Sequence, residues 1–104
     1  MRRVALLLVL ATCSGSPKPT THRVAIRAMT YEPALVDVAI GDTVVWTNMD
    51  VVPHTVTSTS RSAARFDSAS LVQNAQWSYV VSAPGELTYT CTFHPTMFGS
   101  VVAR

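Results

Sequence analysis

The amino-acid sequence predicts an all-β fold, a single domain built as a two-sheet sandwich. From Arg23 onward, short runs rich in valine and threonine alternate apolar with polar residues, and turn residues separate them. No stretch of this part shows a sustained helical period. The chain has 104 residues, of which 48% are hydrophobic and 13% are charged, so it has room for one ordinary domain with its own core. A multidomain enzyme is excluded.

The first thirteen residues predict a signal peptide. Arginines at positions 2 and 3 precede the apolar run 4–11, which is too short to span a bilayer stably. Leu10-Ala11-Thr12-Cys13 resembles the lipobox of bacterial lipoproteins, in which the cysteine becomes the lipidated first residue. A lipid anchor at Cys13 and ordinary cleavage nearby both stay open. Either route predicts an exported protein, in the bacterial periplasm or on the outer face of the membrane.

Residues 14–22 have the composition of a linker, with serine, proline and threonine in most positions, so the folded domain is predicted to span residues 23–104. Its predicted strands are Arg23–Met29, Leu35–Ile40, Thr43–Asn48, His54–Ser58, Trp77–Ser82, Leu87–Cys91 and Ser100–Ala103. Gly41-Asp42 and Pro84-Gly85 each separate two strands at a spacing typical of hairpins. Residues 59–74 lack a clear period, although Phe66 and Leu71 are expected to enter the core. About seven short strands indicate a sandwich.

The charge and the cysteine content of the chain narrow the range of functions it can have. The formal net charge of +2 is carried by Arg2 and Arg3, and without them 8 − 2 = 6 basic residues face 6 acidic ones. A nucleic-acid-binding domain would need a basic face, so no nucleic-acid partner is expected. The mature domain keeps only Cys91, so no disulfide framework is expected. Cys91 is then either a small buried hydrophobe or a residue with chemistry of its own.

Four side chains carry a pattern typical of a metal site. Cys91, His94 and Met97 follow one another at three-residue steps between two predicted strands, and His54 opens a distant strand after Pro53. Two imidazoles, one thiolate and a weak axial thioether are the donors of a blue-copper electron-transfer site. Each residue alone has an ordinary structural explanation in a turn, a core or a surface. Their joint occurrence in an exported domain is hard to explain by packing.

At these residues the sequence resembles the cupredoxins, and among them the amicyanin and plastocyanin branch. The resemblance extends over about residues 24–104, and its motifs are Gly41–Asn48, Pro53-His54, Gly85-x-x-x-Tyr89-x-Cys91 and Cys91-x-x-His94-x-x-Met97. The two-residue gap between His94 and Met97 resembles the short ligand loop of amicyanin. The resemblance implies a cupredoxin-like Greek-key β-sandwich of about seven to eight strands. It also implies one type 1 copper ion held by His54, Cys91, His94 and Met97.

Two positions depart from the family pattern. Thr55 stands where many members have an asparagine that ties the two ligand loops together. Its backbone N–H can still donate to the Cys91 sulfur, and its hydroxyl can take over part of the amide's hydrogen bonds, which tune the reduction potential. Phe93 stands where amicyanin has a proline before the second histidine, and it can add an apolar contact for a partner.

The leading hypothesis is therefore a monomeric one-electron carrier that cycles Cu(I) and Cu(II) between a redox protein donor and acceptor. Docking is expected to be brief and to occur near His94, through an apolar patch of Phe93, Pro95, Phe98 and Pro53. An enzyme is not expected, because only His22 remains besides His54 and His94, which is too few histidines for a second copper centre, and no third group is evident to complete a hydrolase site. The alternatives are an exported copper-storage or copper-delivery protein and a metal-free, immunoglobulin-like binding module.

Overall fold

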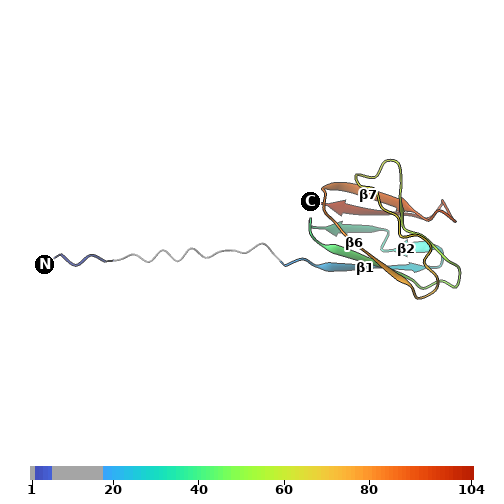
Figure 1. The fold of residues 1–104 in the computed structure, drawn as a ribbon, viewed down its shortest axis with the longest axis horizontal. Coiled ribbons are helices and arrows are strands. Elements are labelled where there is room, and N and C mark those ends of the chain that lie inside the picture. The colour runs from blue at the N-terminus through green and yellow to red at the C-terminus, as the bar shows by residue number, and fades with distance from the viewer. Residues whose placement is uncertain (1, 6–17) are drawn as a thin grey trace.

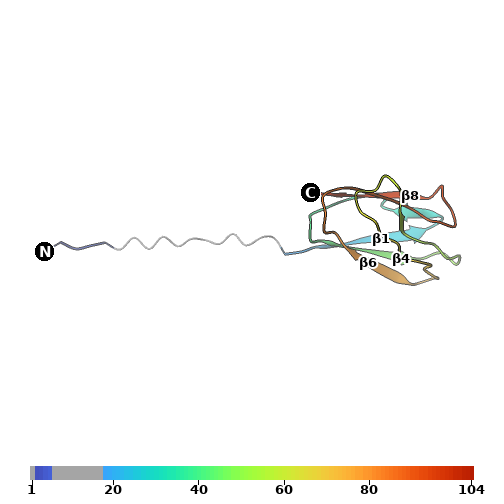
Figure 2. The same cartoon turned by 45° about the horizontal axis from the view of Figure 1, so that its top comes forward.

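The computed structural model describes residues 2–5 and 18–104, and its folded part is a sandwich of two four-stranded sheets. Figures 1 and 2 show the two layers and the connecting loops at either end. In the described residues all regular elements are strands: β1 (Thr21–Arg27), β2 (Thr30–Glu32), β3 (Leu35–Val38), β4 (Thr43–Asn48), β5 (Thr57–Ser58), β6 (Gln76–Val80), β7 (Gly85–Thr90) and β8 (Phe98–Ala103). The predicted all-β sandwich is confirmed.

Both sheets mix parallel and antiparallel pairs. The first sheet has the order β2-β1-β4-β6, with β1 parallel to β4 and β6 antiparallel to it. The second has the order β3-β8-β7-β5, with β3 parallel to β8 and β7 antiparallel to it. Strands β4 and β7 both end at the end of the sandwich opposite the start of β1 (Figure 1). The loops that follow them, residues 49–56 and 91–97, therefore meet there.

The core lies between the two sheets and is rich in aromatic side chains. Trp46 and Tyr89 are its largest fully buried residues, and their rings lie 5.4 Å apart in an edge-to-face arrangement. Phe66 and Leu71 enter the core as predicted. Gly99 on β8 lies against the Tyr89 ring, where a Cβ atom would overlap that ring. Glycine at this position therefore lets a large aromatic side chain fill the centre of the sandwich.

The predicted strand Arg23–Met29 is wrong at its end. Ala28 and Met29 have φ angles of 52° and 63°, in the left-handed region, and the chain turns there into the short strand β2. Such angles are uncommon outside glycine. They are stabilised by Asp50, whose carboxylate accepts hydrogen bonds from the Ala28 and Met29 N–H groups at 2.8 and 3.0 Å. A contact with a residue more than twenty positions away thus ends the strand.

Two predicted hairpins are also wrong. Gly41-Asp42 connects β3 to β4, and Pro84-Gly85 connects β6 to β7, but in each case the two strands belong to different sheets. The turns carry the chain across the sandwich because the neighbouring positions are occupied by strands distant in sequence: β8 pairs with β3, and β1 pairs with β4. The predicted strand His54–Ser58 shortens to β5, and His54 instead forms an isolated bridge with Leu71.

At the N-terminal side, β1 begins at Thr21, inside the segment predicted as a linker. The Asp42 carboxylate anchors this start, because it accepts hydrogen bonds from the Thr20 N–H at 2.9 Å and pairs with the His22 ring at 2.8 Å. Cys13 lies outside the described residues, so the signal peptide and the lipid anchor stay predictions. Within the described ranges, the structure contains no helix with the length and apolarity needed to cross a membrane.

Candidate metal centre

Three of the four predicted ligands meet at the end of the sandwich where the 49–56 and 91–97 loops lie. One ligand atom each from His54, Cys91 and His94 lies within 4.8 Å of the others. The Nδ1 atoms of His54 and His94 are 3.6 and 3.7 Å from the Cys91 Sγ. The thiol and His54 are fully buried, whereas His94 is half-buried. The cluster is thus a buried donor set with one imidazole reaching the surface.

The 91–97 loop brings its ligands together through two consecutive tight turns. The His94 N–H donates to the Cys91 carbonyl at 3.2 Å, and the Met97 N–H donates to the His94 carbonyl at 2.9 Å. Pro95 stands at the second position of the second turn, where its fixed φ angle favours the turn. The three-residue spacing in the sequence is therefore the spacing of these turns. Met97 follows the second turn and is buried in the core cluster, with 4% of its surface exposed.

Hydrogen bonds of the buried Asn48 side chain help to position His54. The Asn48 amide donates to the Val52 and Leu71 carbonyls at 3.0 and 2.8 Å, and its side-chain oxygen accepts the Asp50 N–H. These bonds fold the loop that leads to Pro53. His54 and Leu71 then exchange two backbone hydrogen bonds at 3.1 and 2.7 Å. The main chain of His54 is thereby held in place by hydrogen bonds within the protein, independently of a metal ion.

Asp50 fixes the ring of His54. Its carboxylate lies 2.8 Å from the His54 Nε2, so Nε2 carries the proton and the Nδ1 lone pair faces the Cys91 sulfur. Burial by itself raises the pKa of Asp50, but hydrogen bonds from Met29, His54 and Ala28 outweigh it and hold that pKa below its usual value. A metal-binding histidine that donates its other ring nitrogen to a carboxylate is a common arrangement, because it orients the ring and raises its basicity.

Thr55 joins the two loops, as predicted from the sequence. Its N–H donates to the Cys91 Sγ at 3.3 Å, and its hydroxyl oxygen accepts the Thr92 N–H at 2.9 Å. The Thr55 carbonyl accepts a buried hydrogen bond from the Tyr31 hydroxyl at 2.6 Å. The two bonds to residues 91 and 92 connect the loops in the way that the family's asparagine was expected to do.

Sequence reasoning missed Asn48, Asp50 and Tyr31. The segment Asn48-x-Asp50 has turn composition, which is the one local signal for the first two. The contacts of Asp50 with residues 28 and 29, and that of Tyr31 with Thr55, span more than twenty positions. No periodicity or short motif encodes such distant pairs.

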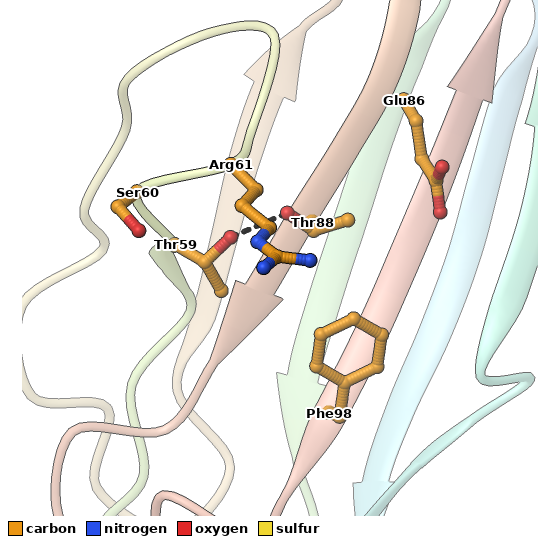
Figure 3. A pocket seen from close by; sticks show the side chains of 6 residues that line it. All are labelled: Thr59, Ser60, Arg61, Glu86, Thr88 and Phe98. Atoms are coloured by element: carbon orange, nitrogen blue, oxygen red, sulfur yellow. Dashed lines mark hydrogen bonds between the residues drawn. The ribbon is translucent and has the colours of Figure 1, made fainter.

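A surface hollow lies elsewhere, between the 59–61 loop and the strands β7 and β8 (Figure 3). Arg61 extends over it, and a Thr59–Thr88 hydroxyl hydrogen bond lies at its side. It is lined by residues other than the four predicted ligands: Thr59, Ser60, Arg61, Glu86, Thr88 and Phe98. The side chains that could hold a metal ion therefore gather at the histidine–cysteine cluster and not in this hollow.

The donor set fits copper. Imidazole nitrogen and thiolate sulfur are borderline and soft ligands, and two histidines with one cysteine form the trigonal set of blue-copper sites. The Cys91 sulfur receives one N–H hydrogen bond from Thr55 and is shielded from water. His54 directs its Nδ1 toward this sulfur. The residues are already arranged to receive a single ion.

Comparisons with known proteins agree with this chemistry. The family model of copper-binding proteins of the plastocyanin/azurin family matches residues 20–104. Amicyanin-alpha of Methylorubrum extorquens is 36% identical over 97 residues, which cover 91% of this chain and 81% of that protein. Amicyanin of Paracoccus denitrificans is 33% identical over 83 residues, which cover 78% of this chain and 63% of that protein.

Solved structures with the same fold include copper proteins. A Cu(I) structure of an amicyanin variant with methionine replaced by alanine superposes with a TM-score of 0.75 at 29% identity, covering 81% of this chain and 82% of that one. A purple cupredoxin from Nitrosopumilus maritimus superposes with a TM-score of 0.72 at 29% identity, covering 80% and 99%. Together with the buried His54–Cys91–His94 cluster, these matches establish that the chain belongs to the plastocyanin/azurin family of copper-binding proteins, as an amicyanin-like cupredoxin.

Proposed function

We propose that the protein is a type 1 (blue) copper electron carrier in which His54, Cys91, His94 and Met97 hold one copper ion. The observation that carries the proposal is the approach of two imidazole Nδ1 atoms to one buried thiol, at 3.6 and 3.7 Å. The similarity to amicyanins supports the same function. Met97 is buried at the end of the same loop, and its thioether would be the weakest of the four ligands to the ion.

Bound copper supplies a one-electron couple, Cu(II)/Cu(I). The chain's own residues keep the ligands in one arrangement for both states. Asp50 holds the His54 ring, the Thr55 N–H holds the Cys91 sulfur, and two tight turns hold the 91–97 loop. Because little of this network needs to move when charge changes by one, the reorganisation cost is low. A low cost is what makes electron transfer fast.

His94 is the point at which an electron enters or leaves. It is half-buried, whereas His54 is enclosed. Phe93 and Phe98 are 53% and 55% exposed, and Pro53 and Pro95 are exposed as well. These four residues are proposed as the apolar patch, and one of them, Phe98, also lines the hollow in Figure 3. A small apolar patch on a mature domain with balanced charge suits brief contacts with a redox protein donor and acceptor, since such encounters bury little area. The domain acts as a monomer and not as an enzyme.

The second candidate, a copper-storage or copper-delivery protein, uses the same ligands, so retention of copper distinguishes the two. The copper-loaded domain is cycled repeatedly between ferricyanide and ascorbate in the presence of a Cu(I) chelator, and copper is quantified after each cycle. A carrier keeps its copper and its absorbance through many cycles. Loss of copper to the chelator within the first reductions would favour delivery and refute the carrier.

The site of action is proposed from the sequence of the first thirteen residues. The charged start, the short apolar run and Cys13 support export to the periplasm or the outer face of the membrane, with Cys13 as the candidate lipid attachment point. Mass spectrometry of the N-terminal peptide from the host's membrane and periplasmic fractions tests this. A diacylated Cys13 would establish the anchor, and an uncleaved Met1 in the cytoplasmic fraction would refute export.

A further inference from the structure

Thr55 uses every polar group it has. Its N–H donates to the Cys91 Sγ, its carbonyl accepts from the Tyr31 hydroxyl, and its Oγ1 accepts the Thr92 N–H. The same Oγ1 lies 2.8 Å from the Thr57 Oγ1 and 3.3 Å from the Thr92 Oγ1. The residue is buried, with 3% of its surface exposed, so water does not compete for these bonds.

The hydroxyl chain continues outward from Thr55 to a carboxylate. The Thr57 Oγ1 donates to the Asp67 Oδ1 at 3.1 Å. Thr57 and Asp67 are also joined by a β-bridge, and the Asp67 Oδ1 accepts the Ala69 N–H at 2.8 Å. The Asp67 end of the hydroxyl chain is therefore held in place by the polypeptide backbone on both sides.

The direction of every hydrogen bond in this chain is determined by its two ends. An ionised carboxylate only accepts, so the single hydroxyl proton of Thr57 points to Asp67. The Thr57 oxygen can then only accept from Thr55, whose single proton points to Thr57. Thr55 is left with its lone pairs toward the Thr92 N–H, which only donates. The order is Thr92 N–H to Thr55 to Thr57 to Asp67.

We propose that Thr55, Thr57 and Asp67 are positioning residues: a directed hydroxyl chain that holds the Thr92 peptide N–H, and through it the neighbouring Cys91, in the ligand position. The negative charge on Asp67 polarises the chain and makes the Thr55 oxygen a stronger acceptor. This hydroxyl chain, made of two hydroxyls and a surface carboxylate, takes the place of the asparagine side chain found in many family members. It thereby couples the 59–74 segment, which supplies no ligand, to the 91–97 loop.

The primary test uses copper-free protein and reads the exchange of the Thr92 amide proton with deuterium by NMR. Thr55→Val keeps the shape and removes the hydroxyl, and it should speed this exchange by about tenfold or more, since the amide loses its acceptor. Thr57→Val, which interrupts the chain at a half-buried position, should speed it by a smaller factor. Thr55→Ser should restore protection. Unchanged Thr92 exchange in both valine variants would overturn the proposal.

Thr88→Val is the matched control. It removes a threonine hydroxyl on β7 that pairs with the Thr59 hydroxyl and takes no part in the hydroxyl chain. It should leave Thr92 exchange as in the unaltered protein. If Thr88→Val speeds exchange at Thr92 as much as Thr57→Val does, a general loosening of the sheet explains the effect and the proposal is wrong.

A second readout rests on the proposed function, because it uses copper-loaded protein. Asp67→Asn keeps an acceptor for Thr57 and removes the charge. It should shift the reduction potential and leave the copper content unchanged, whereas Thr88→Val should do neither. An unshifted potential would refute the polarising role of Asp67. Because amide exchange is measured without copper, failure of the electron-carrier function would leave the hydroxyl chain testable by itself.

Discussion

Replacing Asp50 by alanine removes one carboxylate that three donors share. The Ala28 and Met29 N–H groups lie 2.8 and 3.0 Å from it, and the His54 Nε2 lies 2.8 Å from it. The side chain is 16% exposed, so water can replace only part of these bonds. At a net contribution of about 1 kcal/mol each, their loss costs about 3 kcal/mol of folding free energy. For a domain of this size, that lowers the melting temperature by about 12–24 °C.

The effect on metal binding follows from the ring of His54. Without the carboxylate, the tautomer and orientation of the ring are no longer fixed, and losses of this kind weaken metal binding by about 10- to 100-fold. Thermal unfolding of the copper-free protein and competition with a chelator measure the two quantities. Asp37→Ala is the control, because Asp37 is 70% exposed and its ion pair with Arg104 at 3.7 Å contributes less than about 1 kcal/mol. If Asp50→Ala matches this control in both assays, the account of Asp50 is refuted.

Three further changes test other parts of the structure. Gly99→Ala drives a methyl group into the buried Tyr89 ring and should cost about 1–3 kcal/mol or more in urea unfolding; an unchanged midpoint would contradict the packing described. Hydrogen bonds led by the Thr20 N–H lower the pKa of Asp42 from 3.8 to about 2. A depressed carboxyl pKa adds stability that is complete above pH 4 and disappears as the pH falls to about 2. Compared with the unaltered protein, Asp42→Asn should therefore have a lower free energy of unfolding near neutral pH and should lose less of it between pH 4 and pH 2. An equal loss of unfolding free energy in both proteins over that range would contradict the role of Asp42. Met97→Leu should leave copper bound and shift the reduction potential, and an unmoved potential would remove Met97 from the axial role.

Local features of the fold could be predicted from the sequence. Thr43–Asn48 has the predicted bounds because its apolar run is bordered by turn residues and lies between two partner strands. The turns at Gly41-Asp42 and Pro84-Gly85 were located correctly, but their role was not. Which sheet the chain enters after a turn depends on pairing with strands far along the sequence. A local pattern does not contain that information.

In the metal centre, too, the parts that depend on local sequence could be predicted, and the parts that depend on distant contacts could not. Cys91, His94 and Met97 share one loop, and two tight turns translate their spacing into proximity, so the sequence carries that part of the site. His54 was predicted jointly with them, and the structure places its Nδ1 beside the thiol. Asp50 was missed because its role comes from contacts with the 28–29 turn, which its carboxylate in turn stabilises. Mutual dependence of this kind is visible only in three dimensions.

The central claim, that one copper ion is bound by Cys91 and two histidines, is tested most directly by adding one equivalent of Cu(II) to the domain from about residue 17 onward. The visible absorption spectrum and the electron paramagnetic resonance spectrum are then recorded. The account predicts an intense blue thiolate-to-copper band with narrow parallel hyperfine splitting, and the loss of both in a folded Cys91→Ser variant. A folded protein that stays colourless, or a Cys91→Ser variant that turns blue, would contradict it.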